Sequence, residues 1–171
     1  MLYILYTIKN KEYKKIVKDI IRNVDFKKLY NIEHHGISRM EHSVKISYYS
    51  YRIAKRLGMD YVSVARGGLL HDFFLDGDER NGKEKFLDTF THPKRALNTS
   101  IENFNVNSIE KNIIVSHMFP IYKSIPKYKE SILVNVIDKI IGGKELLRGF
   151  ACKFRYRFNY SYILLLLLMT R

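Results

Sequence analysis

The chain has 171 residues, of which 46% are hydrophobic and 27% charged, and its formal net charge is +13 at pH 7. This balance predicts one folded domain and excludes a disordered or repetitive chain, while the single cysteine, Cys152, excludes an internal disulfide. The basic excess would attract phosphorylated small molecules, nucleic acid or an anionic membrane, but lysines spread along the whole chain do not predict a specific nucleic-acid site.

The first predicted elements form an N-terminal helical lid over residues 1–35. Residues 11–23 place apolar side chains on one stripe and lysines opposite, which is the pattern of an amphipathic helix. Asp25 is expected to cap a short helix that follows. His34 and His35 begin a turn and are expected at the surface.

A long helix is predicted over residues 39–56. Ser38, with Glu41 three residues later, fits a capping box at its start. His42 falls on an apolar row and is expected to face the interior. That row continues through Ile46, Tyr49 and Ile53.

A second helix follows Gly58, which ends the first one, and Asp60, which can cap the next. Gly67 and Gly68 weaken this helix by about 1 kcal/mol each relative to alanine, a cost that is explained if a neighbouring backbone approaches closely. The helix ends in His71-Asp72. Buried polar groups need partners, and a metal ion would satisfy both side chains; a backbone carbonyl for His71 and a capping role for Asp72 are the alternative.

Three further helices are predicted in the second half of the chain. A polar, glycine-bearing loop over residues 76–82 is expected to line a site. His92 would cap a helix that starts at Pro93, and Ser108 would cap a helix that presents His117. The last helix, over about 128–147, carries Asp138 beside an apolar row of Ile132, Val136 and Ile140. No segment shows persistent strand alternation, so the fold class is predicted to be all-α, a single-domain helical bundle.

The C-terminal tail, residues 146–171, is basic and aromatic and then apolar. Its run Tyr160–Met169 is too short to cross a bilayer, which takes about 20 apolar residues. It is expected to dock on the core, with weak contact to an anionic membrane surface as the alternative. No leader with a cleavage site is recognisable at the N-terminus, so a cytoplasmic location is expected.

Six side chains in these helices are candidate metal ligands. Their spacings suit successive helices that meet at one level of a bundle. Four imidazoles and two carboxylates exceed the needs of one zinc ion and suit two ions that share a carboxylate, for which Asp72 is the natural bridge. Taken singly, His92 could be an ordinary cap, His117 a satisfied core imidazole, and Asp138 the partner of a lysine or a tyrosine. The six candidates are His42, His71, Asp72, His92, His117 and Asp138.

This pattern resembles the HD-domain superfamily of metal-dependent phosphohydrolases. The resemblance rests on His42 in Arg39-Met40-Glu41-His42-Ser43, on Gly68-Leu69-Leu70-His71-Asp72, and on Asp138 in Val136-Ile137-Asp138-Lys139, and it covers residues 36–145, the predicted HD domain. With His92 and His117 the set is similar to the six-ligand, binuclear version found in small stand-alone bacterial members, which include hydrolases of symmetrical dinucleoside polyphosphates.

The resemblance implies two divalent metal ions, drawn from Fe, Mn, Co, Zn or Mg. One ion would take His42, His71, Asp72 and Asp138, and the other Asp72, His92 and His117. The implied activity is hydrolysis of a phosphate ester or anhydride, with a nucleotide or similar small phosphorylated molecule as substrate and a metal-activated water as nucleophile.

Four basic residues near these motifs are candidates to hold the substrate phosphate. Arg39 and Lys139 are the stronger pair, Lys94 and Arg95 the weaker one, and solvated surface charge is the alternative for each. The predicted catalytic residues are His71 and Asp72 together with the stronger pair, Arg39 and Lys139.

The sequence departs from one branch of this superfamily. Cyclic-di-GMP phosphodiesterases follow the doublet with glycine and lysine and carry a Gly-Tyr-Pro motif, whereas Phe73-Phe74-Leu75 follows here. The acidic residues of the superfamily's 5'-nucleotidases are not matched either. Two other functions remain open, a mixed-valent di-iron oxygenase with a similar ligand set and a nucleotide-binding sensor. The sequence predicts no particular oligomeric state.

Overall fold

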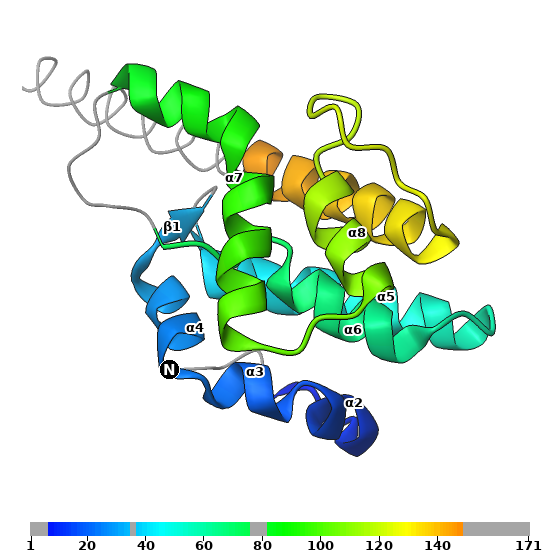
Figure 1. Ribbon diagram of the computed structural model, residues 1–171. Coiled ribbons are helices and arrows are strands. Elements are labelled where there is room, and N and C mark those ends of the chain that lie inside the picture. Colours follow the sequence, from blue (N-terminus) through cyan, green and yellow to red (C-terminus); the bar gives the residue numbers. More distant parts are fainter. Residues whose placement is uncertain (1–6, 35–36, 76–81, 149–171) are drawn as a thin grey trace, which may run out of the picture.

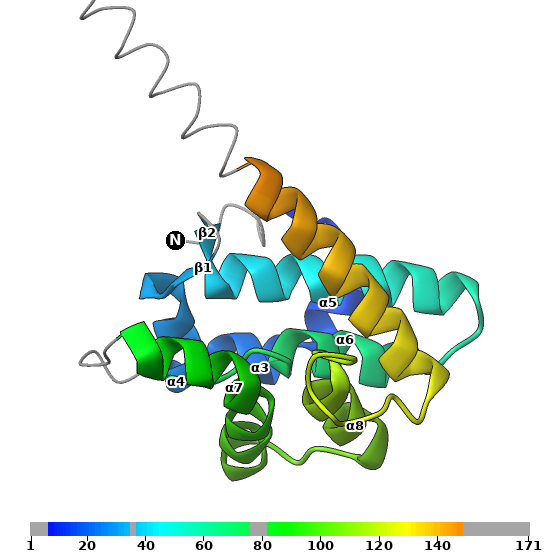
Figure 2. The ribbon, with the colours of Figure 1, turned by 90° about the horizontal axis from the view of Figure 1, so that it is seen from above.

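The computed structural model describes residues 7–34, 37–75 and 82–148, with the side chains of 33–34 and 82–90 left out of the description. The predicted all-α, single-domain class is confirmed. The helices gather around the central pair α5 and α6, with α8 and α7 on one side and the last helix crossing over α5 (Figures 1 and 2).

The elements follow one another with short connections. In chain order they are α2 (Lys11–Ile16), α3 (Lys18–Arg22), α4 (Val24–Lys28), the 3-10 helix η1 (Leu29–Asn31), β1 (Glu33–His34), β2 (Ile37–Ser38), α5 (Arg39–Arg56), α6 (Tyr61–Leu70), α7 (Gly82–Asn103), α8 (Ser108–Ser116) and a last helix over residues 129–148. The two strands pair antiparallel, Glu33 opposite Ser38. They were not predicted, because two residues are too few to show alternation.

The helix starts follow local capping chemistry. Ser38 Oγ accepts from the Glu41 amide at 3.1 Å and Asp60 accepts from the Ser63 amide at 3.0 Å, as predicted, and Gly58 ends the α5 segment with a φ of 63°. The predicted caps at Asp25 and Ser108 were wrong, and the predicted cap at His92 is corrected below with helix α7.

Neighbouring asparagines take the place of those two caps. Asn23, not Asp25, caps α4 through the Phe26 amide, and Asn107, not Ser108, caps α8 in a reciprocal capping box with Glu110. In both places an amide side chain one or two residues earlier reaches the orphan N–H groups first. The predicted helix over 11–23 is likewise divided at Val17 into α2 and α3.

Helices α5 and α6 touch through their backbones. A Cβ added at Gly68 would lie 3.1 Å from Ser47 Cα, and one added at Gly67 would meet the Ile113 side chain at 2.9 Å. The predicted close approach of a neighbouring backbone is therefore confirmed at Gly68, whereas at Gly67 the close neighbour is a side chain of α8. Ser47 fixes the crossing further, since its hydroxyl donates to Ala65 O at 2.6 Å and accepts from Tyr13 at 2.8 Å.

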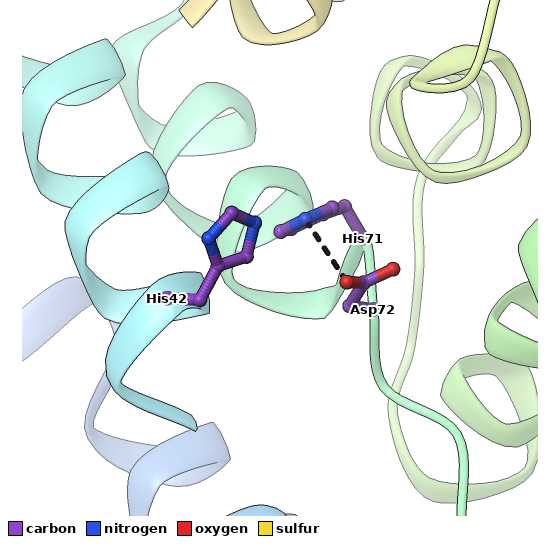
Figure 3. A group of neighbouring side chains, drawn as sticks. All are labelled: His42, His71 and Asp72. Carbon is purple, nitrogen blue, oxygen red and sulfur yellow. Dashed lines mark ion pairs between the residues drawn. The ribbon is translucent and has the colours of Figure 1, made fainter. Parts of the chain in front are cut away.

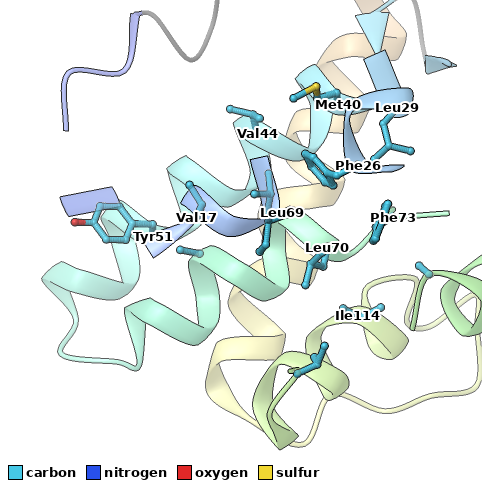
Figure 4. Close-up of a cluster of buried hydrophobic side chains, with 14 of the residues drawn as sticks. Val17, Phe26, Leu29, Met40, Val44, Tyr51, Leu69, Leu70, Phe73 and Ile114 are labelled. Carbon is cyan, nitrogen blue, oxygen red and sulfur yellow. The ribbon is translucent and has the colours of Figure 1, made fainter. Parts of the chain in front are cut away.

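Two clusters of buried side chains flank the α5–α6 pair. The larger one joins the N-terminal helices to the centre, and Figure 4 shows Val17, Phe26 and Leu29 gathered with Leu69 and Leu70. The smaller one lies where α5, α6, α8 and the last helix meet; it contains Ile46, Ala54, Val64, Ile113 and Val134. The N-terminal segment therefore supplies core, and its predicted role as a lid remains a prediction.

The buried faces of two helices differ from the predicted rows. Ile132, Val136 and Ile140 are 53%, 45% and 47% exposed, and Tyr49 of α5 is 49% exposed. The last helix instead buries a face that includes Asn135 and Glu145. Hydrophobic periodicity selects the wrong face of the last helix, because the face that packs on the rest of the fold includes polar side chains of the site described below.

Helix α7 also differs from the prediction. It runs from Gly82 to Asn103 with Pro93 inside it, so His92 lies within the helix and is not its cap. The predicted loop over 76–82 falls almost wholly outside the described residues, as do His35 and the tail beyond 148, while His34 lies in β1. Across the described part of the chain, no helix combines the length and apolarity needed to pass through a bilayer.

Candidate metal centre

Five helical elements bring the predicted ligands to one interior place. His42 lies in the first turn of α5, and His71 and Asp72 follow the last residue of α6. His92 comes from α7 and His117 is the C-cap of α8. Asp138 comes from the 129–148 helix. The fold thus brings residues from five successive helices to one level of the bundle.

The first group of donors is His42, His71 and Asp72, shown in Figure 3. His71 Nε2 lies 3.6 Å from Asp72 Oδ2. Asp138 borders this group, since its Oδ1 lies 3.1 Å from His42 Nε2 and 3.8 Å from His71 Nε2. All four residues have side chains that are at most 14% exposed.

The second group of donors is Asp72, His92 and His117. Asp72 Oδ1 lies 3.5 Å from His92 Nε2 and 3.4 Å from His117 Nε2, and the two imidazole nitrogens are 3.0 Å apart. Asp72 thus belongs to both groups and offers a different oxygen to each. This division suits a carboxylate that bridges two cations.

The tautomers of His71 and His117 follow from their outer nitrogens. His71 Nδ1 lies 2.8 Å from Gly68 O, and His117 Nδ1 lies 2.7 Å from Ile114 O. A carbonyl can only accept, so both Nδ1 atoms carry the proton and both Nε2 atoms present a lone pair to the site when neutral. His71 Nε2 is buried and makes no hydrogen bond to any part of the chain that the structure describes.

That orphaned nitrogen is the observation that tests the fit of a metal. A buried acceptor without a partner is costly, and a cation would satisfy it. The alternative proposed for His71, a backbone carbonyl as partner, accounts for Nδ1 only. Nitrogen and carboxylate donors are the set that Zn, Fe, Mn and Co accept, so the residues present fit a divalent metal.

The pKa values of these groups reflect burial and mutual attraction. Burial lowers the pKa of His71 to about 4, which keeps it neutral. The pKa of Asp72 lies well below its ordinary value, because the neighbouring imidazoles outweigh burial. Burial opposes the charge on His42, yet hydrogen bonds to Asp138 and Glu145 raise its pKa to about 10. The Asp72 carboxylate is therefore ionised.

Sequence reasoning missed two side chains that support the histidines, one through the ring of His42 and one through the backbone of His117. Glu145 Oε2 lies 2.7 Å from His42 Nδ1, and Asn135 Nδ2 donates to His117 O at 2.6 Å. Both lie on the same helical face as Asp138: Asn135 comes three residues before it and Glu145 seven residues after it. That spacing is the signal that could have found them.

The predicted phosphate-binding residues lie around the centre with other contacts. Arg39 is buried, donates to Phe74 O at 2.9 Å and lies 3.9 Å from the centre of the Phe74 ring. Arg95 donates to Leu75 O at 3.0 Å. Lys139 Nζ donates to Asn135 Oδ1 at 2.8 Å and to His117 O at 3.2 Å.

The fourth basic candidate, Lys94, is exposed. The phosphate-binding role of all four residues remains a prediction. Phe74 itself stacks on His92, with ring centres 5.3 Å apart. Because the two arginines donate to the carbonyls of Phe74 and Leu75, they stabilise the segment that follows the His71-Asp72 doublet.

Comparison with known proteins gives one match. A family model described as the HD domain matches residues 39–142, more than half of the chain. The matched segment begins in the first turn of α5 and ends in the last helix, so it contains all six predicted ligands. No curated protein and no solved structure matches the chain.

Proposed function

The chain belongs to the HD-domain family, and on this premise we propose that it is a phosphohydrolase that cleaves a phosphate ester or anhydride of a nucleotide or a similar small phosphorylated molecule. The family consists in general of metal-dependent hydrolases. The proposal extends that activity class to this chain and names the bond type and the substrate class. A cytoplasmic setting, expected from the sequence, is part of the proposal.

The observation that carries the proposal is the shared position of Asp72. Its two oxygens are divided between the two donor groups, so this one side chain could contribute a ligand to each of two divalent cations. When bound, two divalent cations would supply an activated water and offset the negative charge that builds on the phosphoryl oxygens.

The chain's own residues prepare this chemistry. His71 and His117 are held by carbonyls of their own helices, so their Nε2 lone pairs are aimed before any ligand arrives. We propose that Asp72 bridges, that Asp138 completes the set around His42 and His71, and that Lys139 and Arg39 contact the substrate phosphate. The net positive charge would draw a polyanionic substrate toward the protein.

The test is a metal-resolved screen for released phosphate. Protein stripped with a chelator would be loaded in turn with Mn, Co, Zn, Fe or Mg and offered nucleotides, dinucleoside polyphosphates and sugar phosphates. We expect turnover with at least one metal and none in Asp72→Ala under any condition. Full activity in Asp72→Ala would contradict the proposal.

The di-iron oxygenase is the second candidate, because its ligand set is similar to the one assembled here. Oxygen uptake together with an iron-dependent absorption band would support it. Tight nucleotide binding without turnover across the metal panel would instead indicate a sensor.

A further inference from the structure

Among the side chains that the structure describes, Glu145 is the buried carboxylate at this centre that the six-residue set leaves out. It lies beyond the matched segment 39–142 and is 9% exposed. One of its oxygens lies 2.7 Å from His42 Nδ1, and the other accepts from Lys45 Nζ at 3.0 Å. Its two oxygens are thus both engaged, and neither is placed to serve the donor groups directly.

The outer nitrogen of His42 is held differently from those of its neighbours. His71 and His117 donate to carbonyls three residues back in their own helices. His71 and His117 stand at the C-terminal ends of their helices, where the last carbonyls have no amide donor of their own. His42 lies in the first turn of α5, where the carbonyl three residues back, that of Arg39, accepts within the helix ladder. A charged side chain from the last helix takes that place, 103 residues away in sequence.

We infer that Glu145 is a positioning residue that fixes the ring of His42, so that Nε2 rather than Nδ1 faces the metal site. Its carboxylate accepts the Nδ1 proton and makes the imidazole a stronger donor at Nε2, an arrangement that commonly supports metal-binding histidines. Lys45 holds the carboxylate in turn and is itself held by Glu41 at 3.1 Å. The inference rests on the proposed function for its metal site.

The decisive comparison is Glu145→Gln against Glu130→Gln. Both glutamates are buried in the same helix, but Glu130 accepts from the Asp60 amide at 3.1 Å, at the opposite end of that helix from Glu145. Metal-free protein would be titrated with Zn²⁺ against a chromophoric chelator, and unfolding of the metal-free forms would be followed in parallel. We expect Glu145→Gln to weaken the site that contains His42 by about 10–100-fold and to leave the other site unchanged.

The control separates positioning from general stability. Glu130→Gln is expected to lower stability without changing either zinc affinity, and Glu145→Asp, which keeps the charge but is one methylene shorter, to fall between wild type and Glu145→Gln. Wild-type affinity at both sites in Glu145→Gln would overturn the inference. So would an equal loss at both sites that follows the loss of stability.

A second readout covers the case in which Glu145→Gln does not fold. The imidazole nitrogen resonances of zinc-loaded wild-type protein should show His42 metallated at Nε2 and protonated at Nδ1. Zinc on Nδ1 would overturn the inference. Both measurements are independent of turnover, so a wild-type protein that binds zinc but releases no phosphate with any metal of the panel would end the proposed function and leave this inference standing.

Discussion

Asp72 Oδ1 lies 3.4 Å from His117 Nε2, while the second oxygen of the same carboxylate faces His71 at 3.6 Å. The Asp72 carboxylate therefore faces both donor groups, whereas the adjacent His71 belongs to the first group alone. If each donor group holds one cation, replacing Asp72 should affect the binding of two ions, and replacing a residue that belongs to one group should affect the binding of one.

The first prediction concerns metal stoichiometry. Wild-type protein should bind two equivalents of Zn²⁺ or Mn²⁺, His92→Gln one, and Asp72→Asn close to none, because His92 serves the second group alone and Asp72 serves both. Metal analysis after gel filtration measures this directly. Two equivalents in Asp72→Asn would show that Asp72 does not bridge.

The second prediction concerns the crossing of α5 and α6. Gly68→Ala should destabilise the protein by about 1–3 kcal/mol, since its Cβ would press on the Ser47 backbone. Gly143→Ala is the matched control: its Cβ would meet nothing within 4 Å, and helix propensity favours it by about 0.5–1 kcal/mol. Urea unfolding of both variants gives the comparison. Equal effects would mean that the contact is not tight.

The third prediction concerns the end of α8. Asn135 Nδ2 lies 2.6–3.1 Å from the carbonyl oxygens of Ser116, His117 and Phe119, so Asn135→Asp would set a carboxylate against three acceptors. A loss of about 1–3 kcal/mol is expected, together with weaker binding of the ion held by His117. Asn112→Asp is the milder control, because its Oδ1 still accepts from the Lys127 amide and the Nδ2 that it loses donates to one carbonyl, Ile125 O at 3.3 Å, instead of three. An Asn135→Asp protein as stable as Asn112→Asp would contradict this account.

The fourth prediction distinguishes two candidate caps of α8. Asn107→Ala should cost about 1–2 kcal/mol, because Asn107 accepts from the Glu110 amide at 2.9 Å. Ser108→Ala should change stability by less than about 0.5 kcal/mol. Thermal or urea unfolding measures both, and the reverse order would restore Ser108 as the cap.

The fifth prediction concerns pH. In the metal-free protein the pKa of His42 is raised from 6.5 to about 10, against the effect of burial, by hydrogen bonds to Asp138 and Glu145. The folded state thus holds this proton more tightly than the unfolded chain does. The stabilisation is fully present below pH 6.5 and is lost as pH rises through 10. The difference in melting temperature between wild type and His42→Gln should shrink across that window; a constant difference would exclude the effect.

Short-range chemistry explains which parts of the fold were predictable. The bounds of α5 and the caps at Ser38 and Asp60 depend on residues within one turn, and they were predicted correctly. The starts of α4 and α8 were misplaced because several capping side chains stand next to one another. The asparagines that form the caps, Asn23 and Asn107, also make side-chain hydrogen bonds to distant parts of the fold, and local sequence does not reveal these bonds.

The site shows a different limit. The six candidate ligands converge in the structure, although their binding of metal remains a prediction. Asn135 and Glu145 were missed because the last helix was oriented by Ile132, Val136 and Ile140, whereas its packed face combines another apolar residue, Val134, with polar side chains. The start of α7 was also predicted wrongly. Proline favours the first turn of a helix, so the helix was expected to begin at Pro93, yet α7 continues on both sides of it.

The placement of His71 and His117 directly after the last residues of α6 and α8 also limits how this protein can change in length. Deleting one residue inside either helix would rotate the terminal imidazole by about 100° around the helix axis. A deletion there would disturb the packing of the helix and would also turn its imidazole away from the centre. Insertions and deletions within these two helices should therefore be far more harmful to metal binding than conservative substitutions at the same positions.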